Sequence, residues 1–234
     1  MGNLVEGMAA AIRDGGALPK MPAGLTLEEG YEIQQKVVAA VAGGTVAGLK
    51  AGMTAAAGQQ AFGLTHPLIG SLYESGRLSP GAAFPSVPGV SLECEIGIVV
   101  DGNGAPKSAG PVIEVPRMAF ADEEDRNGAN LVACNIASDR YIVGEQQPLR
   151  DAYGDVQITL TRDGEEVCSA PASDALGGPQ AALAWMLNEA RVRGLGVEDG
   201  MLLITGACGG IHPAVPGQYV ADYGDFGRIE FTVT

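Results

Sequence analysis

SLECEIGIVVD, residues Ser91–Asp101, decides the fold because it combines a long apolar run with two closely spaced carboxylates. Its length and its richness in Ile and Val are typical of a strand that is largely buried. Successive side chains of a strand alternate between its faces, so Glu93 and Glu95 share one face and Cys94 lies on the other. The stretch therefore predicts either a buried pair of carboxylates or a half-exposed strand whose glutamates face water.

A buried pair of carboxylates needs a compensating partner, because the two charges repel each other and lose their hydration. A cation, a shared proton or several hydrogen-bond donors could supply it, and Mg²⁺ or Mn²⁺ would suit because both ions prefer oxygen ligands. A third glutamate, Glu114, lies at the centre of PVIEV, residues Pro111–Val115, which also reads as a strand. With Glu93 and Glu95 it would provide three carboxylates for an octahedral metal site, completed by water or substrate.

The composition is that of an acidic globular protein with many turns. Of its 234 residues, 46% are hydrophobic and 18% charged, which is enough for one large domain or two tightly packed halves. The net charge of −14 makes nucleic acid and anionic membrane surfaces poor partners. No apolar run is long enough to span a membrane.

The N-terminus and the cysteines indicate a reducing compartment. Glu6 comes early, and the segment lacks the basic start and apolar centre of a signal peptide. The four cysteines are far apart, without a C-x-x-C pair, as is typical of buried thiols. We therefore expect a cytoplasmic protein.

Local patterns predict several helices and strands. Thr26 opens a helix, with Glu29 completing a capping box, and Gly43-Gly44 ends it. Lys50 closes an apolar strand, so its ammonium group either extends to solvent or points into a site. The other expected elements are helices over 4–13, 55–62 and 179–193, strands over 46–50, 141–143, 201–205, 218–223 and 228–233, a hairpin over 156–169 that turns at 163–164, a loop over 66–70, and a glycine-rich turn over 206–210.

Several spaced motifs resemble those of one family, in the same order. They are GLKAGMT (48–54) with Gln59, Pro67 and Gly70, then LECEIGIVV (92–100), PVIEV (111–115), NIASDRYIVG (135–144), LGGPQAALAWMLNEARVRG (176–194) and LITGACGGIHPAVPG (203–217). Any one motif alone is weak, but together they are specific. Over roughly residues 25–234 the chain resembles the 2-keto-4-pentenoate hydratase and 4-oxalocrotonate decarboxylase family, within the fumarylacetoacetate hydrolase superfamily.

The resemblance implies an α+β fold, a mixed β-roll or sandwich of the fumarylacetoacetase C-terminal type with flanking helices. We expect residues 1–45 to form an N-terminal helical segment that packs on a catalytic domain of residues 46–234. The resemblance also implies a Mg²⁺ or Mn²⁺ ion, homo-oligomers, and small 2-oxo or 2-hydroxy unsaturated acids from aromatic-ring breakdown as substrates. A complex with a related pathway enzyme is left open.

The same resemblance implies roles for individual residues. The family's metal-binding glutamates, acid/base lysine, substrate-contacting serine and pocket-lining segment correspond here to Glu93, Glu95, Glu114, Lys50, Ser138, Thr205 and Gly206. A metal chelated by the substrate's carboxylate and 2-oxygen would stabilise a developing enolate. Lys50, if desolvated, would have a lowered pKa and could shuttle protons.

The chain departs from the family pattern at three places. Leu68 stands where the hydratases carry an aspartate directly after the proline, and Cys134 replaces the aspartate of an Asp-Asn-Ala-Ser segment. The connection between the two glutamate strands is also shorter than usual. His66 or His212 could substitute as an acid/base group, since histidine titrates near neutral pH.

We therefore expect a metal-dependent lyase, with hydration of a 2-hydroxy-2,4-dienoate as the main hypothesis. Decarboxylation of a 2-oxo-enedioate is the first alternative, and Leu68 makes it more attractive. C–C bond hydrolysis of an acylpyruvate is another. A non-catalytic partner subunit is the alternative outside enzymes, although Lys50 and the three glutamates argue against it.

Overall fold

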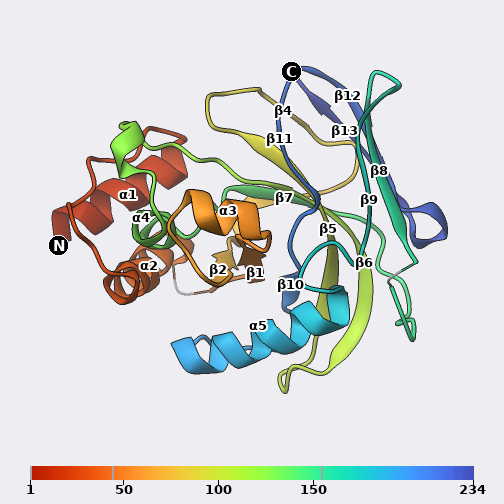
Figure 1. Ribbon diagram of the computed structural model, residues 1–234, viewed down its shortest axis with the longest axis horizontal. Coiled ribbons are helices and arrows are strands. Elements are labelled where there is room, and N and C mark those ends of the chain that lie inside the picture. The colour runs from red at the N-terminus through yellow and green to blue at the C-terminus, as the bar shows by residue number, and fades with distance from the viewer. Residues whose placement is uncertain (1, 44, 154) are drawn as a thin grey trace.

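The computed structural model describes residues 2–43, 45–153 and 155–234, which form two β-sheets with helices around them (Figure 1). The helices are α1 (Gly2–Asp14), α2 (Leu27–Ala42), α3 (Ala56–Ala61), α4 (Gly128–Ala133) and α5 (Pro179–Arg193). The strands are β1 (Gly48–Gly52), β2 (Leu68–Leu72), β3 (Arg77–Leu78), β4 (Ala83–Phe84), β5 (Ser91–Val100), β6 (Pro106–Val115), β7 (Arg140–Val143), β8 (Gln157–Arg162), β9 (Glu165–Pro171), β10 (Leu202–Ile204), β11 (Cys208–Pro213), β12 (Gly217–Asp222) and β13 (Arg228–Val233).

The larger sheet places the glutamate strand at its centre. In the part of the chain that the structure describes, its strands follow the order β2-β1-β10-β5-β6-β7-β3, with β11 pairing along β5 as an eighth strand. The smaller sheet has the order β4-β13-β12-β8-β9. Parallel and antiparallel pairs both occur, as in β1–β10 and β5–β6. The sheets are mixed, curled and flanked by helices, which confirms the expected α+β class.

Strand register brings the glutamates together. β5 and β6 pair antiparallel, with Glu93 opposite Glu114 and Glu95 opposite Val112. Residues that lie opposite each other in adjacent strands share a face of the sheet. Pairing through β10 and β1 then places Lys50 on the same face, because Lys50 pairs with Ile204 and Ile204 pairs with Gly97.

Apolar side chains cover both faces of the larger sheet. The cluster on the glutamate face is small and consists of Leu72, Val112, Tyr141, Leu202 and Ile204. The opposite face, which carries Cys94 and Ile96, joins the main core with the smaller sheet and the helices. The strand predicted over 91–101 is therefore buried on both faces.

Helix α2 begins and ends where the sequence predicts, whereas α4 was not expected as a helix. The Thr26 hydroxyl accepts from the Glu29 N–H at 3.2 Å, and the Glu29 carboxylate accepts from the Thr26 N–H at 2.8 Å, so the capping box is confirmed. The left-handed Gly43, with φ of 64°, ends α2, whereas the other expected capping residue, Gly44, lies outside the described residues. α2 packs against α1 and α4 (Figure 1). No helix among the described residues is both long and apolar enough to cross a membrane.

Two expectations about irregular segments were wrong. Residues 66–70 were expected to be a loop, but Leu68–Leu72 forms β2, paired with β1 along its whole length. The glycine-rich turn expected over 206–210 continues from Cys208 as β11, which pairs with β5. The hairpin over 156–169 is confirmed, and its turn residues Asp163 and Gly164 both adopt left-handed φ values, 52° and 88°.

The contact between β1 and β10 leaves no room for a side chain at Gly48. A Cβ built there would lie 1.8 Å from the Leu202 carbonyl oxygen. We expect Gly48→Ala to lower the free energy of unfolding by about 3 kcal/mol, because the two strands must separate. Urea denaturation measures the change. Gly196→Ala is the matched control, since a Cβ there meets nothing within 4 Å, and an unchanged midpoint for Gly48→Ala would contradict the β1–β10 pairing.

Candidate metal centre

Three carboxylates meet on the glutamate face of the larger sheet, the face that also carries Lys50. One oxygen from each of Glu93, Glu95 and Glu114 lies within 4.8 Å of the other two. Glu95 and Glu114 are 0% and 1% exposed, and Glu93 is half-buried. The alternative of glutamates that face water is therefore wrong for this pair of strands.

These carboxylates accept fewer hydrogen bonds than their oxygen atoms allow. Glu95 accepts from the Gly206 N–H at 2.6 Å, and Glu114 accepts from the Lys50 ammonium. The second oxygens, Oε1 of Glu95 and Oε2 of Glu114, are buried without a partner among the described residues. Burial and then the charge of Glu114 raise the pKa of Glu93 to about 7, and the same two causes raise the pKa of Glu95 well above its usual value. The three carboxylates thus lack enough positive charge nearby to balance their own negative charge.

A hard divalent cation fits this arrangement. Oxygens around an octahedral Mg²⁺, with bonds of about 2.1 Å, lie about 3 to 4 Å apart, within the spread of the three carboxylates. The unpartnered oxygens of Glu95 and Glu114 would gain a ligand. Among the described residues, this is the one group of ligating side chains close enough to hold a metal ion.

Lys50 is a buried cation beside the carboxylates. It is 3% exposed, forms an ion pair with Glu114, and donates to the Ile136 carbonyl at 3.0 Å. Burial alone would lower the pKa of Lys50, but attraction to Glu114 and Glu93 and the hydrogen bond to Glu114 raise it overall. The lowered pKa expected from desolvation is therefore reversed by the carboxylates, and a cation bound to them would weaken this effect.

A strained turn holds the carbonyl that meets Lys50. Asn135, Ile136 and Ala137 have consecutive left-handed φ values of 58°, 53° and 55°. Such a conformation costs non-glycine residues about 1 kcal/mol or more each, so it persists only where surrounding contacts impose it. The Asn135 side chain supplies such contacts, since its amide accepts from the Ser71 N–H and donates to the Ser71 carbonyl, both at 2.8 Å. The turn aims the Ile136 carbonyl at the Lys50 ammonium.

The expected substrate-binding residues lie close to this centre, in different settings. Ser138 directly follows the strained turn and is 5% exposed. Thr205 fastens β10 to β5, because its hydroxyl donates to the Ile96 carbonyl at 2.9 Å. Gly206 has φ of 102°, and a Cβ there would lie 2.5 Å from the Thr54 methyl carbon, so only glycine lets its N–H reach Glu95.

The position of the missing hydratase aspartate is apolar and closed. Leu68 is 0% exposed. Gly70 of β2 pairs with Lys50 of β1, and Leu68 lies two residues before Gly70. The Leu68 side chain is therefore on the Lys50 face of the sheet. The position at which the resemblance implied an aspartate in hydratases therefore carries no acid here.

The structure brings neither histidine to the carboxylates. His66 is exposed, and its ring contacts the Thr65 hydroxyl at 3.3 Å. His212 lies opposite Leu92 in the β5–β11 pair, so it is on the face away from Glu93, and its ring bonds the Gly209 carbonyl at 2.8 Å. An acid/base role for either one gains no support from this placement.

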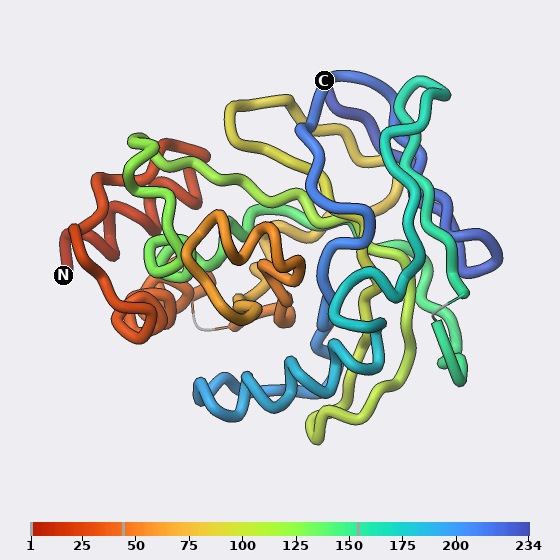
Figure 2. Tube along the Cα trace, viewed as in Figure 1, coloured from red at the N-terminus to blue at the C-terminus, as the bar shows by residue number. Residues whose placement is uncertain are grey.

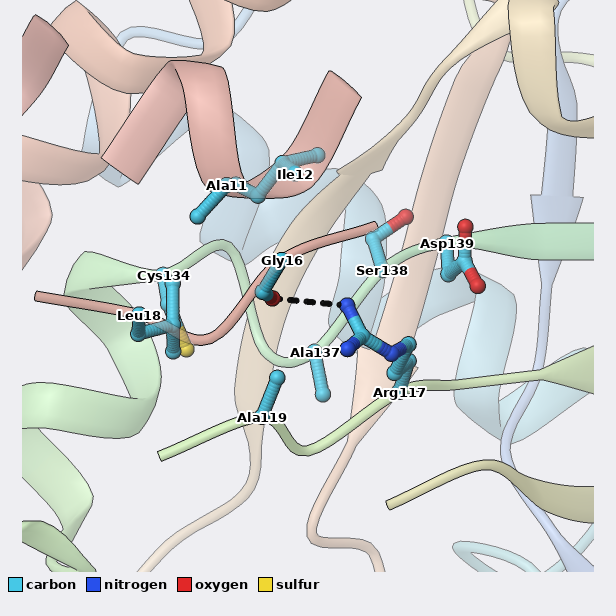
Figure 3. A pocket seen from close by; sticks show the side chains of 10 residues that line it. All are labelled: Ala11, Ile12, Gly16, Leu18, Arg117, Ala119, Cys134, Ala137, Ser138 and Asp139. Carbon is cyan, nitrogen blue, oxygen red and sulfur yellow. Dashed lines mark hydrogen bonds between the residues drawn. The ribbon is translucent and has the colours of Figure 1, made fainter. Parts of the chain in front are cut away.

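A small cavity with a mixed apolar and polar lining lies beside Ser138 and was not anticipated from the sequence. It separates the end of α1 from the segment after the strained turn (Figure 3). Arg117 donates to the Gly16 carbonyl at 2.9 Å, whereas its Nε and the Oδ2 of Asp139 are buried and have no partner in the described part of the chain. The cavity, about 20 Å³, holds about one water. Arg117 follows Glu114 by three residues, and no sequence pattern singles it out.

Sequence comparison finds hydratases and decarboxylases. No family model matches the chain. A 2-keto-4-pentenoate hydratase of Burkholderia vietnamiensis is 28% identical over an alignment that covers 99% of this chain and 98% of the relative. A 4-oxalocrotonate decarboxylase of a Pseudomonas species is 24% identical, covering 99% and 97% of the two chains.

Structural comparison finds the same fold. A 4-oxalocrotonate decarboxylase of Pseudomonas putida G7, complexed with magnesium and adipate, has a TM-score of 0.89 at 21% identity, covering 99% of this chain and 96% of the other. A fumarylpyruvate hydrolase of Pseudomonas aeruginosa, in complex with Mn²⁺ and pyruvate, has a TM-score of 0.61 at 15% identity, covering 80% and 88%. The chain is thus similar in sequence to 2-keto-4-pentenoate hydratases and 4-oxalocrotonate decarboxylases, and it shares its fold with solved structures of a 4-oxalocrotonate decarboxylase, a fumarylpyruvate hydrolase and a putative fumarylacetoacetate hydrolase family protein, as its motifs predicted.

Proposed function

We propose that the protein is a divalent-metal-dependent lyase that acts on small unsaturated 2-oxo or 2-hydroxy acids. Hydration of a 2-hydroxy-2,4-dienoate is the main reaction. The observation that carries this proposal is the buried cluster of Glu93, Glu95 and Glu114 with Lys50 beside it. The hydratase relative, which matches this chain over nearly its whole length, supports it.

Each site residue has a task in this proposal. Glu93, Glu95 and Glu114 would hold Mg²⁺ or Mn²⁺, and the bound ion would supply positive charge to a substrate oxygen. Lys50 would hold and move a proton at its Nζ atom, kept in place by Glu114 and the Ile136 carbonyl. The neighbouring Ser138, Thr205 and Gly206 would line the substrate pocket.

Decarboxylation of a 2-oxo-enedioate is the second candidate, and Leu68 favours it. The buried apolar side chain leaves the Lys50 face without the extra acid that hydratases carry. The fold relative that is a decarboxylase binds adipate, a dicarboxylate, and in this chain Arg117 offers an unpartnered N–H close to Ser138. A second carboxylate on the substrate would suit such a donor.

Direct assay with both substrate types tests the proposal. With Mg²⁺ present, a 2-hydroxy-2,4-dienoate should lose its ultraviolet absorbance if the protein is a hydratase. A 2-oxo-enedioate should release CO₂ if it is a decarboxylase. No turnover of either acid, with Mg²⁺ or Mn²⁺, would contradict both candidates and favour the non-catalytic alternative.

The pKa shifts predict how pH and metal act together on stability. The pKa of Glu93, about 7, and the raised pKa of Glu95 both exceed the unfolded value of about 4.3, so the folded protein binds more protons in this window. Without metal, stability should therefore fall as pH rises from about 5 through about 7. A divalent cation replaces those protons, so the rise in Tm with millimolar Mg²⁺ should be larger at about pH 8 than at about pH 6. Thermal denaturation checks this, and a larger rise at the lower pH would refute it.

We also propose how the chain is divided into segments and how it assembles. The helical segment of residues 1–45 would pack on a catalytic domain of residues 46–234, which is supported by the packing of α2 against α4. The chain would act as a homo-oligomer in the cytoplasm, with or without a related pathway enzyme. Analytical ultracentrifugation tests self-association.

A further inference from the structure

A second cavity lies between the end of α1 and the start of β7. Its volume is about 250 Å³, so it is much larger than the single-water cavity beside Ser138, which it adjoins because Ile12 and Asp139 line both. Its walls come from the end of α1, the segment after β2 and the start of β7. α1 lies at the end of the molecule away from the smaller sheet (Figure 2). Three of the polar side chains that line this cavity, Tyr73, Asp139 and Arg140, suggest a ligand.

These three side chains carry buried polar atoms that lack a hydrogen-bond partner. They are the hydroxyl of Tyr73, Oδ2 of Asp139 and Nη1 of Arg140, none of which has a partner among the described residues. Tyr73 is only 2% exposed. Nε of Arg140 is 3.9 Å from Oδ1 of Asp139, which is longer than a hydrogen bond, so the two charged groups do not satisfy each other. Buried polar groups without partners are rare in folded proteins, and each one calls for a ligand or water.

The protonation states define what the cavity offers. Burial raises the pKa of the Tyr73 hydroxyl, so this group stays protonated and can donate. Arg140 keeps its charge at any ordinary pH. Burial also raises the pKa of the Asp139 carboxyl, although the charge of Arg140 opposes this. At the rim, Arg13 and Asp14 are exposed and of opposite charge, so they largely cancel. The cavity therefore offers two donor groups and one carboxyl group.

The cavity is separate from the proposed metal centre. Tyr141 pairs with Glu114 across β7 and β6, so these two side chains share a face of the sheet. Arg140 precedes Tyr141 and therefore points to the other face. Tyr73 has extended backbone and follows Leu72, which belongs to the apolar cluster of the glutamate face, so Tyr73 also points to the other face. A ligand of this cavity would bind without the metal ion.

We propose that this cavity binds a small 2-hydroxy carboxylate, with its carboxylate on Arg140 and Tyr73 and its hydroxyl on Asp139. A guanidinium group forms charge-assisted hydrogen bonds with a carboxylate, and the phenol adds a second donor. The hydroxyl of the acid donates to the Asp139 carboxylate, or accepts from it when it is protonated. Such a ligand satisfies all three groups at once. A carboxylate without the hydroxyl would leave Asp139 unpaired beside a like charge.

Calorimetric titration of L-lactate and of D-lactate into the full-length protein tests the site. EDTA in the buffer keeps Mg²⁺ away from the carboxylate cluster, so the result does not depend on the proposed lyase activity. One enantiomer should bind at one site per chain. Propionate, which lacks only the 2-hydroxyl, should bind at least about five-fold more weakly. No saturable binding of either enantiomer, or equal Kd values for lactate and propionate, would overturn the proposal.

Variants locate the binding site. Tyr73→Phe removes only the hydroxyl and should raise the Kd for lactate about five-fold, and Arg140→Met should raise it at least about ten-fold. Arg191→Met changes an exposed residue of α5 and is the matched control, which should keep the original Kd. Glu95→Gln should also keep it. An unchanged Kd in both Tyr73→Phe and Arg140→Met would overturn the proposal. A loss of binding in Glu95→Gln would place lactate at the carboxylate cluster and would overturn it as well.

Discussion

Glu95→Gln should abolish metal binding and activity while leaving the fold intact. The pKa of Glu95 is raised well above its usual value, mainly by burial, so the charged form of this side chain is disfavoured when no cation compensates it. Glutamine has the same shape and can still accept from the Gly206 N–H. It cannot supply the negative charge that a hard cation needs, so we expect Mg²⁺ affinity to fall at least about 100-fold and kcat/KM about 1000-fold.

The measurements are Mg²⁺ titration and urea denaturation of the same samples. Glu32→Gln, a change at an exposed position of α2, is the matched control and should alter neither result. Retained Mg²⁺ affinity in Glu95→Gln would show that the three carboxylates are not the metal site. If urea denaturation shows that Glu95→Gln also destabilises the fold, the lost Mg²⁺ affinity would be a structural effect.

Lys50→Met should separate proton transfer from metal binding. Methionine keeps much of the length and apolar contact of the lysine side chain but carries no proton, so turnover should fall about 1000-fold, within the range for a general acid–base group. Without Mg²⁺, removing the buried partner of Glu114 should cost about 3 to 5 kcal/mol of stability, because the three carboxylates lose their nearest cation. Mg²⁺ should restore most of that stability, since it supplies the missing positive charge.

Lys107→Met is the control for this variant. Lys107 is exposed and pairs with the exposed Asp199, so its replacement should change stability by less than about 1 kcal/mol and leave turnover unchanged. Normal turnover in Lys50→Met would refute the acid/base role. If Lys50→Met loses both Mg²⁺ binding and turnover, Lys50 is needed to form the metal site and its role is not confined to proton transfer.

The glutamate strand could be predicted because its signals are local. Period-two alternation places Glu93 and Glu95 on one face wherever the strand lies. The position of Glu114 opposite Glu93 depends on register, which the short turn after β5 sets. There the Asp101 carboxylate accepts from the N–H groups of Asn103 and Ala105, at 2.8 and 2.9 Å. A sequence shows the polar turn residues but not the pairing that follows from them.

Other parts of the site depend on contacts that no local pattern reports. β2 is short and contains Gly70, yet its pairing with β1 makes it a strand. The left-handed turn at 135–137 has no glycine, and isoleucine disfavours this conformation, so the hydrogen bonds between Asn135 and Ser71 must impose it. Arg117 and Asp139 are single charged residues in otherwise ordinary segments, and only the folded chain shows them beside Ser138.

Calorimetric titration of oxalate, with and without Mg²⁺, tests the metal centre most directly. Oxalate mimics the carboxylate and enolate oxygens of the proposed substrate, and it should bind tightly only if a cation is held by Glu93, Glu95 and Glu114. The account predicts binding of one oxalate per chain in the presence of Mg²⁺ and none in its absence. Equal heats under both conditions, or no binding under either, would contradict it.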